Sequence, residues 1–148
     1  MNVNEKGLTG LIEVIRDLTR KGYECFTPFN DFSAVDLIIM NKEYQTIRLQ
    51  VKYRAFDKSE QIQLELFSIV NGKKIPINRS AIDAYAIYIP DVDCVCYYPI
   101  TDIASDKRSF IVRKSPGKST INVDKKPAPV YSELLDEMRL WNGVRAGR

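Results

Sequence analysis

The N-terminal part of the chain carries an apolar pattern typical of an amphipathic helix. Apolar side chains recur every three or four positions, at Leu8, Leu11, Ile12, Ile15 and Leu18. This spacing places them on one face of a helix that we expect over residues 4–21. The basic pair Arg20 and Lys21, followed by Gly22, indicates where the helix ends.

Two segments after this helix have the patterns of two different strands. Residues 34–40 are apolar almost throughout, which predicts a central strand covered on both faces. Residues 46–54 alternate strictly, which predicts a half-solvated strand. Its apolar positions are Ile47, Leu49, Val51 and Tyr53, and its polar positions are Arg48, Gln50, Lys52 and Arg54. A polar turn over residues 41–44 joins the two strands, and a shorter strand is expected over residues 23–28.

The rest of the chain predicts further strands and a closing helix. Residues 61–70 are a strand candidate followed by the turn signal Asn71-Gly72. Residues 84–89 and 94–99 are expected to form a hairpin near the far side of the sheet. Residues 130–141 return to helical spacing.

One basic segment stands out in a chain whose net charge is only +3. Seven basic and two acidic residues lie between residues 105 and 126. Within it, residues 109–113 and 119–123 flank a Ser-Pro-Gly turn and could form a basic β-ribbon, an element that fits a DNA groove. This concentration of positive charge suits a polyanion partner, although a solvated charged loop has the same composition.

Length and composition indicate a single domain over residues 1–148. The hydrophobic share of 45% and the charged share of 28% are ordinary for a soluble globular protein. The predicted elements give an α/β (α+β) fold. Cys25, Cys94 and Cys96 are expected to be reduced and packed. No apolar run reaches membrane-spanning length and the N-terminus has no signal-peptide core, so we expect a cytoplasmic protein without a membrane partner.

The sequence contains no histidine. This excludes imidazole bases, His-coordinated zinc, and Ser-His-Asp or Cys-His catalysis. Among nucleases it excludes the H-N-H and His-Cys box classes, and no LAGLIDADG or GIY segment is present. Any catalysis must therefore rest on carboxylates, lysines and metal.

Asp36 is a candidate site residue because it lies inside an apolar strand, where an ionised carboxylate is costly unless another group compensates it. With a turn centred near residue 43, antiparallel pairing places Asp36 directly opposite Gln50, on the same face. Lys52 then lies at the diagonal distance of roughly 7 Å. A carboxylate, an amide oxygen and an ammonium would converge at one place.

Such a set suits phosphodiester hydrolysis. Oxygen ligands hold a divalent cation that binds the phosphate and acidifies the attacking water, and a lysine stabilises the developing negative charge. Plainer interpretations stay open from the pattern alone. Asp36 could be a hydrogen-bonded structural aspartate, and the polar positions of residues 46–54 could be the wet face of an edge strand. Glu13 lies opposite the apolar stripe of the helix, as solvated surface residues do.

Several short motifs occur in an order and spacing that resemble a known family. They are Lys6-Gly7, Lys21-Gly22-Tyr23, Thr27-Pro28-Phe29, Val35-Asp36-Leu37-Ile38-Ile39, Arg48-Leu49-Gln50-Val51-Lys52-Tyr53 and Asp83-Ala84-Tyr85-Ala86-Ile87-Tyr88-Ile89-Pro90. Together they resemble the PD-(D/E)-x-K nuclease superfamily, in particular its small phage- and intron-associated members with Q-x-K in the last motif. The resemblance covers residues 6–102. It implies a restriction-endonuclease-like core, with a mixed β-sheet flanked by helices.

The resemblance also implies an activity, that of a Mg²⁺-dependent, site-specific endonuclease of the homing type acting on double-stranded DNA. Asp36 would be the metal-binding aspartate, and Gln50 would take the place of the usual second acid. Lys52 would be the motif lysine, and the main-chain carbonyl of Val51 would be a further metal ligand. Ca²⁺ would replace Mg²⁺ as a non-catalytic ion.

Position 11 departs from the family pattern. Relatives usually carry a glutamate four residues after the glycine that matches Gly7, whereas this chain has Leu11. Glu13 is the acid that would substitute from the next turn, although its predicted face points away. The resemblance thus implies that this chain binds cation weakly and cuts poorly. A Holliday-junction-resolvase-like nuclease and a non-catalytic DNA-binding module are the alternatives.

Recognition of a long DNA site needs more surface than one domain of this size offers. We therefore expect a homo-oligomer, at least a two-fold dimer, and the resemblance suggests a tetramer. Arginines are expected to read guanine edges and lysines to hold phosphates. The DNA-binding candidates are Arg54, Lys58, Arg79, Lys107, Arg108, Arg113, Lys114 and Lys118.

Overall fold

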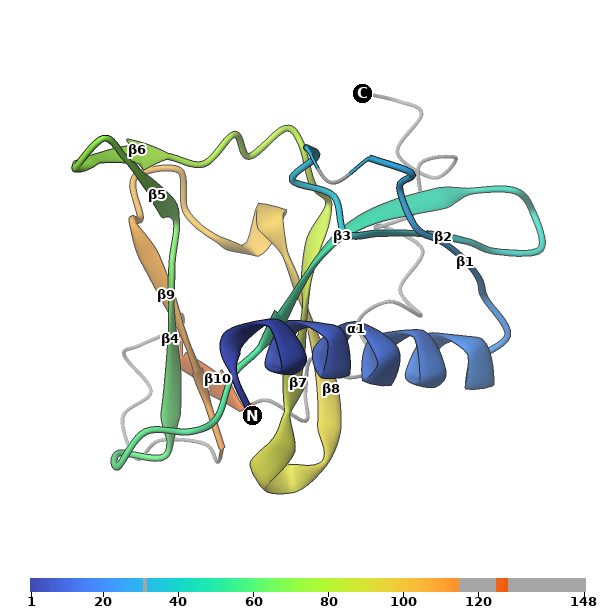
Figure 1. Cartoon of the computed structure of the whole chain (residues 1–148), viewed down its shortest axis with the longest axis horizontal. Coiled ribbons are helices and arrows are strands. Elements are labelled where there is room, and N and C mark those ends of the chain that lie inside the picture. Colours follow the sequence, from blue (N-terminus) through green and yellow to red (C-terminus); the bar gives the residue numbers. More distant parts are fainter. Residues whose placement is uncertain (31, 115–124, 128–148) are drawn as a thin grey trace.

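The computed structural model describes residues 1–30, 32–114 and 125–127. Within these residues, one α-helix packs against a five-stranded sheet, and two smaller sheets stand beside it (Figure 1). The mixed α+β architecture predicted from the sequence is therefore confirmed. The helix predicted over residues 130–141 lies outside the described residues. In the part of the chain that is described, no helix is both long and apolar enough to cross a membrane.

The helix α1 (Val3–Arg20) forms close to where the apolar spacing predicts it. A capping box fixes its start, because the Asn2 side chain accepts a hydrogen bond from the Glu5 N–H and the Glu5 carboxylate accepts one from the Asn2 N–H. Gly22 follows its end with φ of 90°, in the left-handed region that glycine adopts without strain. Local signals therefore set both ends of α1.

The main sheet is mixed, as the resemblance implies. Its strands are, in spatial order, β1 (Glu24–Phe26), β2 (Leu37–Met40), β3 (Thr46–Tyr53), β7 (Ala84–Ile89) and β8 (Cys94–Pro99). β3 and β7 run parallel, and all other neighbours run antiparallel. Because β3 is the middle strand, its polar face is not the wet face of an edge strand.

The predicted hairpin at the far side of the sheet is present. β7 and β8 pair antiparallel, and the 3-10 helix η1 (Pro90–Val92) joins them. A second 3-10 helix, η2 (Ile100–Asp102), follows β8 directly.

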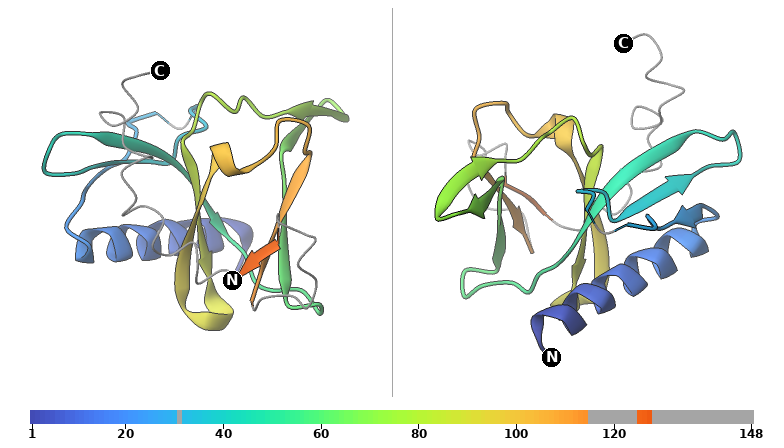
Figure 2. Two further views of the ribbon diagram at one scale, coloured as in Figure 1. Left: turned by 180° about the vertical axis from the view of Figure 1, so that it is seen from behind. Right: turned by 45° about the horizontal axis from the view of Figure 1, so that its top comes forward.

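The remaining strands stand to one side of the main sheet (Figure 2). β4 (Gln61–Glu65), β9 (Ser109–Arg113) and β10 (Lys125–Pro127) form a three-stranded sheet, and β5 (Phe67–Val70) and β6 (Lys73–Pro76) form a separate hairpin. Residues 61–70 therefore make two strands instead of the single one predicted. The break lies at Leu66, whose N–H donates to the carbonyl of Arg108 on a distant segment.

The basic ribbon predicted from residues 109–113 and 119–123 differs from the observed pairing. β9 pairs antiparallel with β4 and parallel with β10, so both of its edges are occupied over residues 111–113. The physical reason is the burial of Phe110 and Val112 in an apolar cluster shared with β4, which a solvated ribbon would lack. Residues 119–123 lie outside the described residues.

Apolar clusters lie on both faces of the main sheet. The cluster under α1 joins the helix to alternate residues of the strands and includes Val14, Leu18, Leu37, Ile39, Ile47, Leu49, Ala84 and Ala86. The cluster on the other face joins β7 and β8 to β4 and β9 and includes Ile62, Leu64, Tyr85, Ile87, Cys96, Tyr98, Phe110 and Val112. The three cysteines are free thiols, as predicted. The alternation predicted for β3 matches its burial at Ile47 and Leu49, whereas residues 50–53 are all half-buried.

Two details of the packing differ from expectation or extend it. Of the four residues of β2, Leu37 and Ile39 are buried while Ile38 and Met40 are half-buried, so the prediction that both faces are fully covered is wrong. α1 comes close to β3 at Gly10, where a Cβ would lie only 3.3 Å from the Tyr53 Cβ. A small residue is therefore needed at this position of the helix.

A buried carboxylate joins β3 to the start of β7. Asp83 is 2% exposed and accepts hydrogen bonds from the Arg48 main-chain N–H at 2.8 Å and from Nε and Nη2 of its guanidinium at 3.1 Å each. The Asp83 N–H donates in turn to the Arg48 carbonyl. Two strands that are far apart in the sequence are thereby fixed in register.

We predict that Asp83→Ala lowers the free energy of unfolding by about 2–3 kcal/mol, because a main-chain N–H and a guanidinium lose their buried acceptor. The cost stays below that of a fully buried pair, since the Arg48 side chain is 37% exposed and water reaches it. Urea unfolding measures the change. The exposed Asp106→Ala serves as a control, with an expected change within about 0.5 kcal/mol; equal losses in the two variants would contradict this role.

Candidate active site

Asp36 lies directly before β2, at a point where the strand ladder becomes irregular. The register predicted between β2 and β3 is confirmed from the pair Leu37–Leu49 onward. At Asp36 it changes, because the Asp36 N–H also donates to the Leu49 carbonyl, at 2.9 Å. Asp36 therefore does not lie directly opposite Gln50, in contrast to the prediction. One extra residue on the β2 side at this point corresponds to a β-bulge, a feature that redirects side chains.

Because the ladder is irregular here, the main-chain N–H of Val51 donates to the Asp36 carboxylate instead of to a main-chain carbonyl. Asp36 Oδ2 accepts this N–H at 2.8 Å. The N–H and C=O of a strand residue point to the same neighbour, so the Val51 carbonyl is directed to the Asp36 side as well. The Asp36 carboxylate and this carbonyl are two of the three oxygen groups predicted as metal ligands, and the Gln50 amide is the third.

Lys52 and Asp36 interact electrostatically, each in a half-buried environment. Burial raises the pKa of the Asp36 carboxyl, while the Val51 N–H and the positive charge of Lys52 act in the opposite direction. Burial and the nearby Arg54 lower the pKa of the Lys52 ammonium, while Asp36 acts to raise it. Both charged forms are thus held in the folded protein at a cost, which is typical of functional sites.

A cleft of about 360 Å³ opens beside Asp36. Its walls come from the first turns of α1, the loop before β2, and β3. The lining residues are Gly7, Leu11, Thr27, Pro28, Asn30, Ser33, Val35, Asp36 and Val51. Position 11 of the helix therefore contributes to the same cleft as Asp36, with an apolar side chain.

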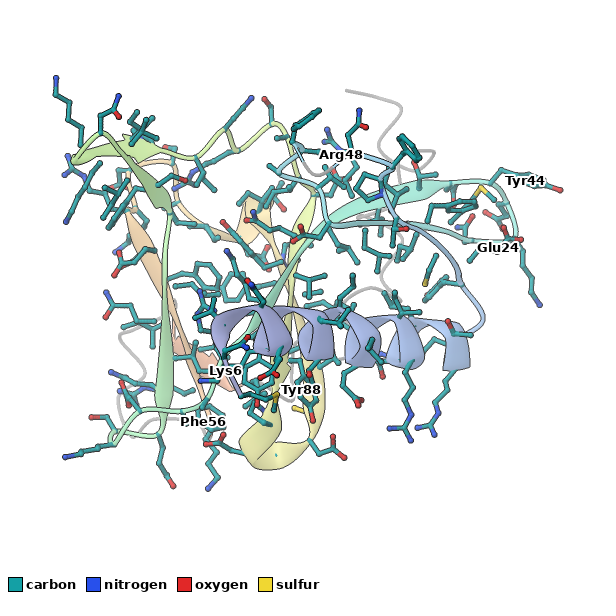
Figure 3. All side chains as sticks on the ribbon, viewed as in Figure 1. Lys6, Glu24, Tyr44, Arg48, Phe56 and Tyr88 are labelled. Atoms are coloured by element: carbon teal, nitrogen blue, oxygen red, sulfur yellow. The ribbon has the colours of Figure 1, made fainter. Side chains whose placement is uncertain are left out.

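Gln50 lies in a neighbouring cavity of about 300 Å³. This cavity is bounded by β3 and by residues of the β5–β6 hairpin and the segment after it. Arg48, on the same face of β3, is bound to Asp83, whereas Tyr44 marks the tip of the β2–β3 turn (Figure 3). The polar side chains of Arg48, Gln50 and Lys52 on β3 therefore lie in three different environments.

Glu13 is not brought to the cleft. It forms an ion pair with Arg16 at 3.6 Å on the same helix and contributes to the electrostatic environment of Tyr88. Leu11, two positions earlier, is the residue that lines the cleft. The structure thus agrees with the helical periodicity, which points Glu13 away from the proposed metal ligands.

The predicted DNA-binding residues fall into two groups. Arg54, Lys58, Lys107 and Arg108 are exposed. Lys114 is exposed too but pairs with Glu60 at 3.2 Å, while Arg79 and Arg113 are half-buried and Arg79 donates to the carbonyls of Ile103 and Lys107. Lys118 lies outside the described residues.

The oxygen donors present fit a hard divalent cation. Within residues 1–30, 32–114 and 125–127, no three His, Cys, Asp or Glu side chains gather into a metal-binding group. A cation at Asp36 would therefore have one carboxylate and the Val51 carbonyl as protein ligands, with water in the remaining positions, whereas Gln50 lines the neighbouring cavity. Mg²⁺ accepts such a set, since it commonly keeps several waters.

The Arg48–Asp83 ion pair is the part of this region that the sequence analysis missed. One signal for it exists, because Asp83 directly precedes the apolar run over residues 84–89 and a carboxylate there needs a partner. Nothing local in the sequence identifies Arg48 as that partner.

Comparison with known proteins gives a consistent family and fold. A family model described as PD-(D/E)XK endonuclease matches residues 1–125. The structure is similar to that of the bacterial homing endonuclease I-Ssp6803I, with a TM-score of 0.69, 14% sequence identity, and coverage of 99% of this chain and 96% of that one. It is also similar to Hjc, a Holliday junction resolvase from Archaeoglobus fulgidus, with a TM-score of 0.51, 13% identity, and coverage of 74% and 84%. No curated protein sequence matches this chain.

We predict that Asp36→Asn raises the midpoint of thermal unfolding at pH 7. Burial raises the pKa of Asp36, so the folded state favours the protonated carboxyl, and this contribution to stability is lost as the pH rises through the folded pKa. The gain from Asn should disappear as the pH falls well below 3.8, the ordinary value, because Asp36 is then protonated in both states of the wild-type protein. Unfolding curves at several pH values test this, with the exposed Asp106→Asn as control; a stability loss at pH 7 for Asp36→Asn would contradict it.

Proposed function

Because this chain belongs to the PD-(D/E)XK endonuclease family, we propose that it is a divalent-metal-dependent endonuclease that cuts double-stranded DNA at specific sites, as homing endonucleases do. One observation supports this most strongly. The Asp36 carboxylate and the Val51 main chain are joined by a hydrogen bond beside one cleft, and the positive charge of Lys52, the next residue of β3, acts on the same carboxylate.

Each residue of this group has a role in the proposal. Asp36, the Val51 carbonyl and Gln50 would hold Mg²⁺, which when bound polarises the scissile phosphate and acidifies water. Lys52 binds the phosphate and stabilises the negative charge that develops on it, and its partial burial strengthens this interaction. The hydrogen bond from Val51 fixes one carboxylate oxygen of Asp36, so the carboxylate is oriented before the substrate arrives.

Leu11 limits the affinity for the cation. Among the described residues that line the cleft, Asp36 is the one carboxylate, and the positive charge of Lys52 acts on it. Little net negative charge is therefore available to attract a divalent cation. We expect weak binding of Mg²⁺ and slow cleavage, with Ca²⁺ occupying the same ligands as a non-catalytic ion.

Cleavage of both strands requires two copies of the site. We propose a homo-oligomer, a dimer or tetramer, in which two-fold symmetry directs one cleft to each strand. Arg54, Lys58, Lys107 and Arg108 are exposed and would contact the duplex. Their guanidinium groups suit guanine edges, and their ammonium groups suit phosphates.

Two other functions have support from specific observations. Similarity to the archaeal junction resolvase supports activity on four-way junctions, in which case affinity would not depend on sequence. Leu11 in the cleft supports a DNA-binding module without catalysis. A homing-type enzyme, in contrast, should prefer its own duplex by about 4–10 kcal/mol over random DNA.

The test is a selection of cleaved duplexes from a random-sequence library with Mg²⁺, followed by assays of Lys52→Ala on the selected duplex. We expect Lys52→Ala to reduce cleavage by at least about a hundredfold, because stabilisation of the phosphate charge is lost. Affinity measured with Ca²⁺ should remain close to that of the wild-type protein. Lys42→Ala, in the distant β2–β3 turn, is the charge-matched control and should cleave normally.

Three results would contradict the proposal in different ways. Equal loss of cleavage and binding in Lys52→Ala would remove its catalytic role. Equal affinity for junctions of any sequence would favour the resolvase function. Sequence-specific binding with no cleavage, even in Leu11→Glu, would favour the non-catalytic module.

We predict that Leu11→Glu increases Mg²⁺-dependent cleavage by about tenfold or more, because a second carboxylate beside Asp36 raises the affinity for the cation. Without cation, the two like charges repel, so the variant should also unfold at a lower temperature and gain more stability from Ca²⁺ than the wild-type protein does. Leu11→Gln, of similar size but uncharged, is the control. Equal cleavage by the Glu and Gln variants would show that charge at position 11 does not limit activity.

A further inference from the structure

The β5–β6 hairpin is an exposed two-stranded element beside the candidate active site. Its turn, Asn71-Gly72, has φ of 50° and 75°, as a tight hairpin turn of two left-handed residues requires. Every residue from Ser68 to Pro76 is exposed. In Figures 1 and 2 the hairpin projects from the body of the molecule, at the opposite end from the β2–β3 turn.

The two faces of this hairpin are turned to different cavities. The register pairs Ser68 with Ile75 and Val70 with Lys73, which places these side chains on one face. Ser68, Val70 and Ile75 line the cavity that contains Gln50. A substrate that contacts Gln50 would therefore meet this face of the hairpin next.

The charge of the hairpin favours a polyanion. Between Phe67 and Pro76 the sequence contains Lys73 and Lys74 and no acidic residue. The side chains that line the cavity shared with Gln50 are all uncharged, so the two lysines near the tip are the charges that an approaching phosphate backbone would meet on the hairpin. Lys74 Nζ lies 4.6 Å above the Phe67 ring, on the hairpin face that lines a second cavity, away from Gln50.

The apolar side chains of the hairpin are unusually exposed. Ile69, Val70 and Ile75 are 68%, 48% and 46% exposed. Such residues are costly in water and indicate a contact surface. A two-stranded β-ribbon fits the major groove of B-DNA, where apolar side chains contact thymine methyl groups.

We propose that the β5–β6 hairpin is a DNA-reading ribbon that enters the major groove next to the cleavage position. Lys73 and Lys74 bind phosphates on the groove edges, and Val70 and Ile75, on the face toward Gln50, contact base edges. This inference rests on the proposed function, since it takes duplex DNA as the substrate at Gln50. The β5–β6 hairpin thus takes the role that the sequence pattern predicted for a ribbon of residues 109–113 and 119–123.

The experiment measures the affinity of the full-length protein for a pool of random-sequence duplexes in Ca²⁺, at several salt concentrations. Lys73→Ala/Lys74→Ala should bind at least about tenfold more weakly at about 0.1 M salt, and the slope of log affinity against log salt should decrease by about two. The control is Arg20→Ala/Lys42→Ala, which removes the same charge from exposed positions at the opposite end of the molecule. It should bind like the wild-type protein.

A second pair of variants tests base contact separately from charge. Val70→Thr and Ile75→Thr keep β-branched side chains suited to a strand and change the apolar surface. Each should leave affinity for the random pool nearly unchanged and alter the sequences selected from it at positions beside the cleavage site. An unchanged selection in both variants would overturn the assignment of base contacts.

The failure of this inference and that of the proposed function give different results. Equal loss of affinity in the two double variants, or unchanged affinity in Lys73→Ala/Lys74→Ala, overturns the ribbon even if the wild-type protein cleaves. A change of sedimentation coefficient with unchanged DNA affinity would identify the hairpin instead as a contact between copies. A wild-type protein that binds duplexes but cuts none contradicts the proposed function, while the affinities still decide for or against the ribbon.

Discussion

The candidate site depends on one hydrogen bond, from the Val51 N–H to the Asp36 carboxylate. A regular ladder would satisfy this N–H with a main-chain carbonyl of the preceding segment. The extra residue before β2 removes that acceptor and puts a carboxylate in its place. The charge is thereby held in a half-buried position and directed at β3. The Asp36 carboxylate thus satisfies a main-chain N–H of the sheet, and the same hydrogen bond orients the carboxylate.

A second carboxylate fixes the same strand from its other side. Asp83 receives the Arg48 N–H and guanidinium, at the point where β7 begins to run beside β3. The middle strand is therefore held between two acids at Arg48 and Val51, and Gln50 lies between those two positions. This arrangement leaves little freedom to the polar face of β3. Rigid placement on a central strand is what a site needs when its geometry determines the rate.

Much of this organisation is predictable from the sequence because it is local. The apolar spacing identifies α1, the strict alternation identifies β3, and the short turn before it fixes the register of four residue pairs. The bulge at Asp36, the partner of Asp83 and the pairing of β9 with β4 are different in kind. They depend on contacts between distant segments, which a period of two or of 3.6 residues does not encode. The hairpin turn Asn71-Gly72 is recognisable from the sequence, whereas the pairing of β4 with β9, which the hydrogen bond from Leu66 to Arg108 continues, is not.

The close approach of α1 to β3 explains why position 11 matters. Gly10 allows the helix backbone to lie against Tyr53, and this contact brings Gly7 and Leu11 to the cleft beside Asp36. With leucine there, the positive charge of Lys52 offsets much of the negative charge of Asp36. Under the proposed function, a divalent cation bound alone would leave a large positive charge in a partly desolvated place, which is unfavourable. The phosphate of the substrate supplies the missing negative charge, so cation and DNA should bind this site together more tightly than either does alone.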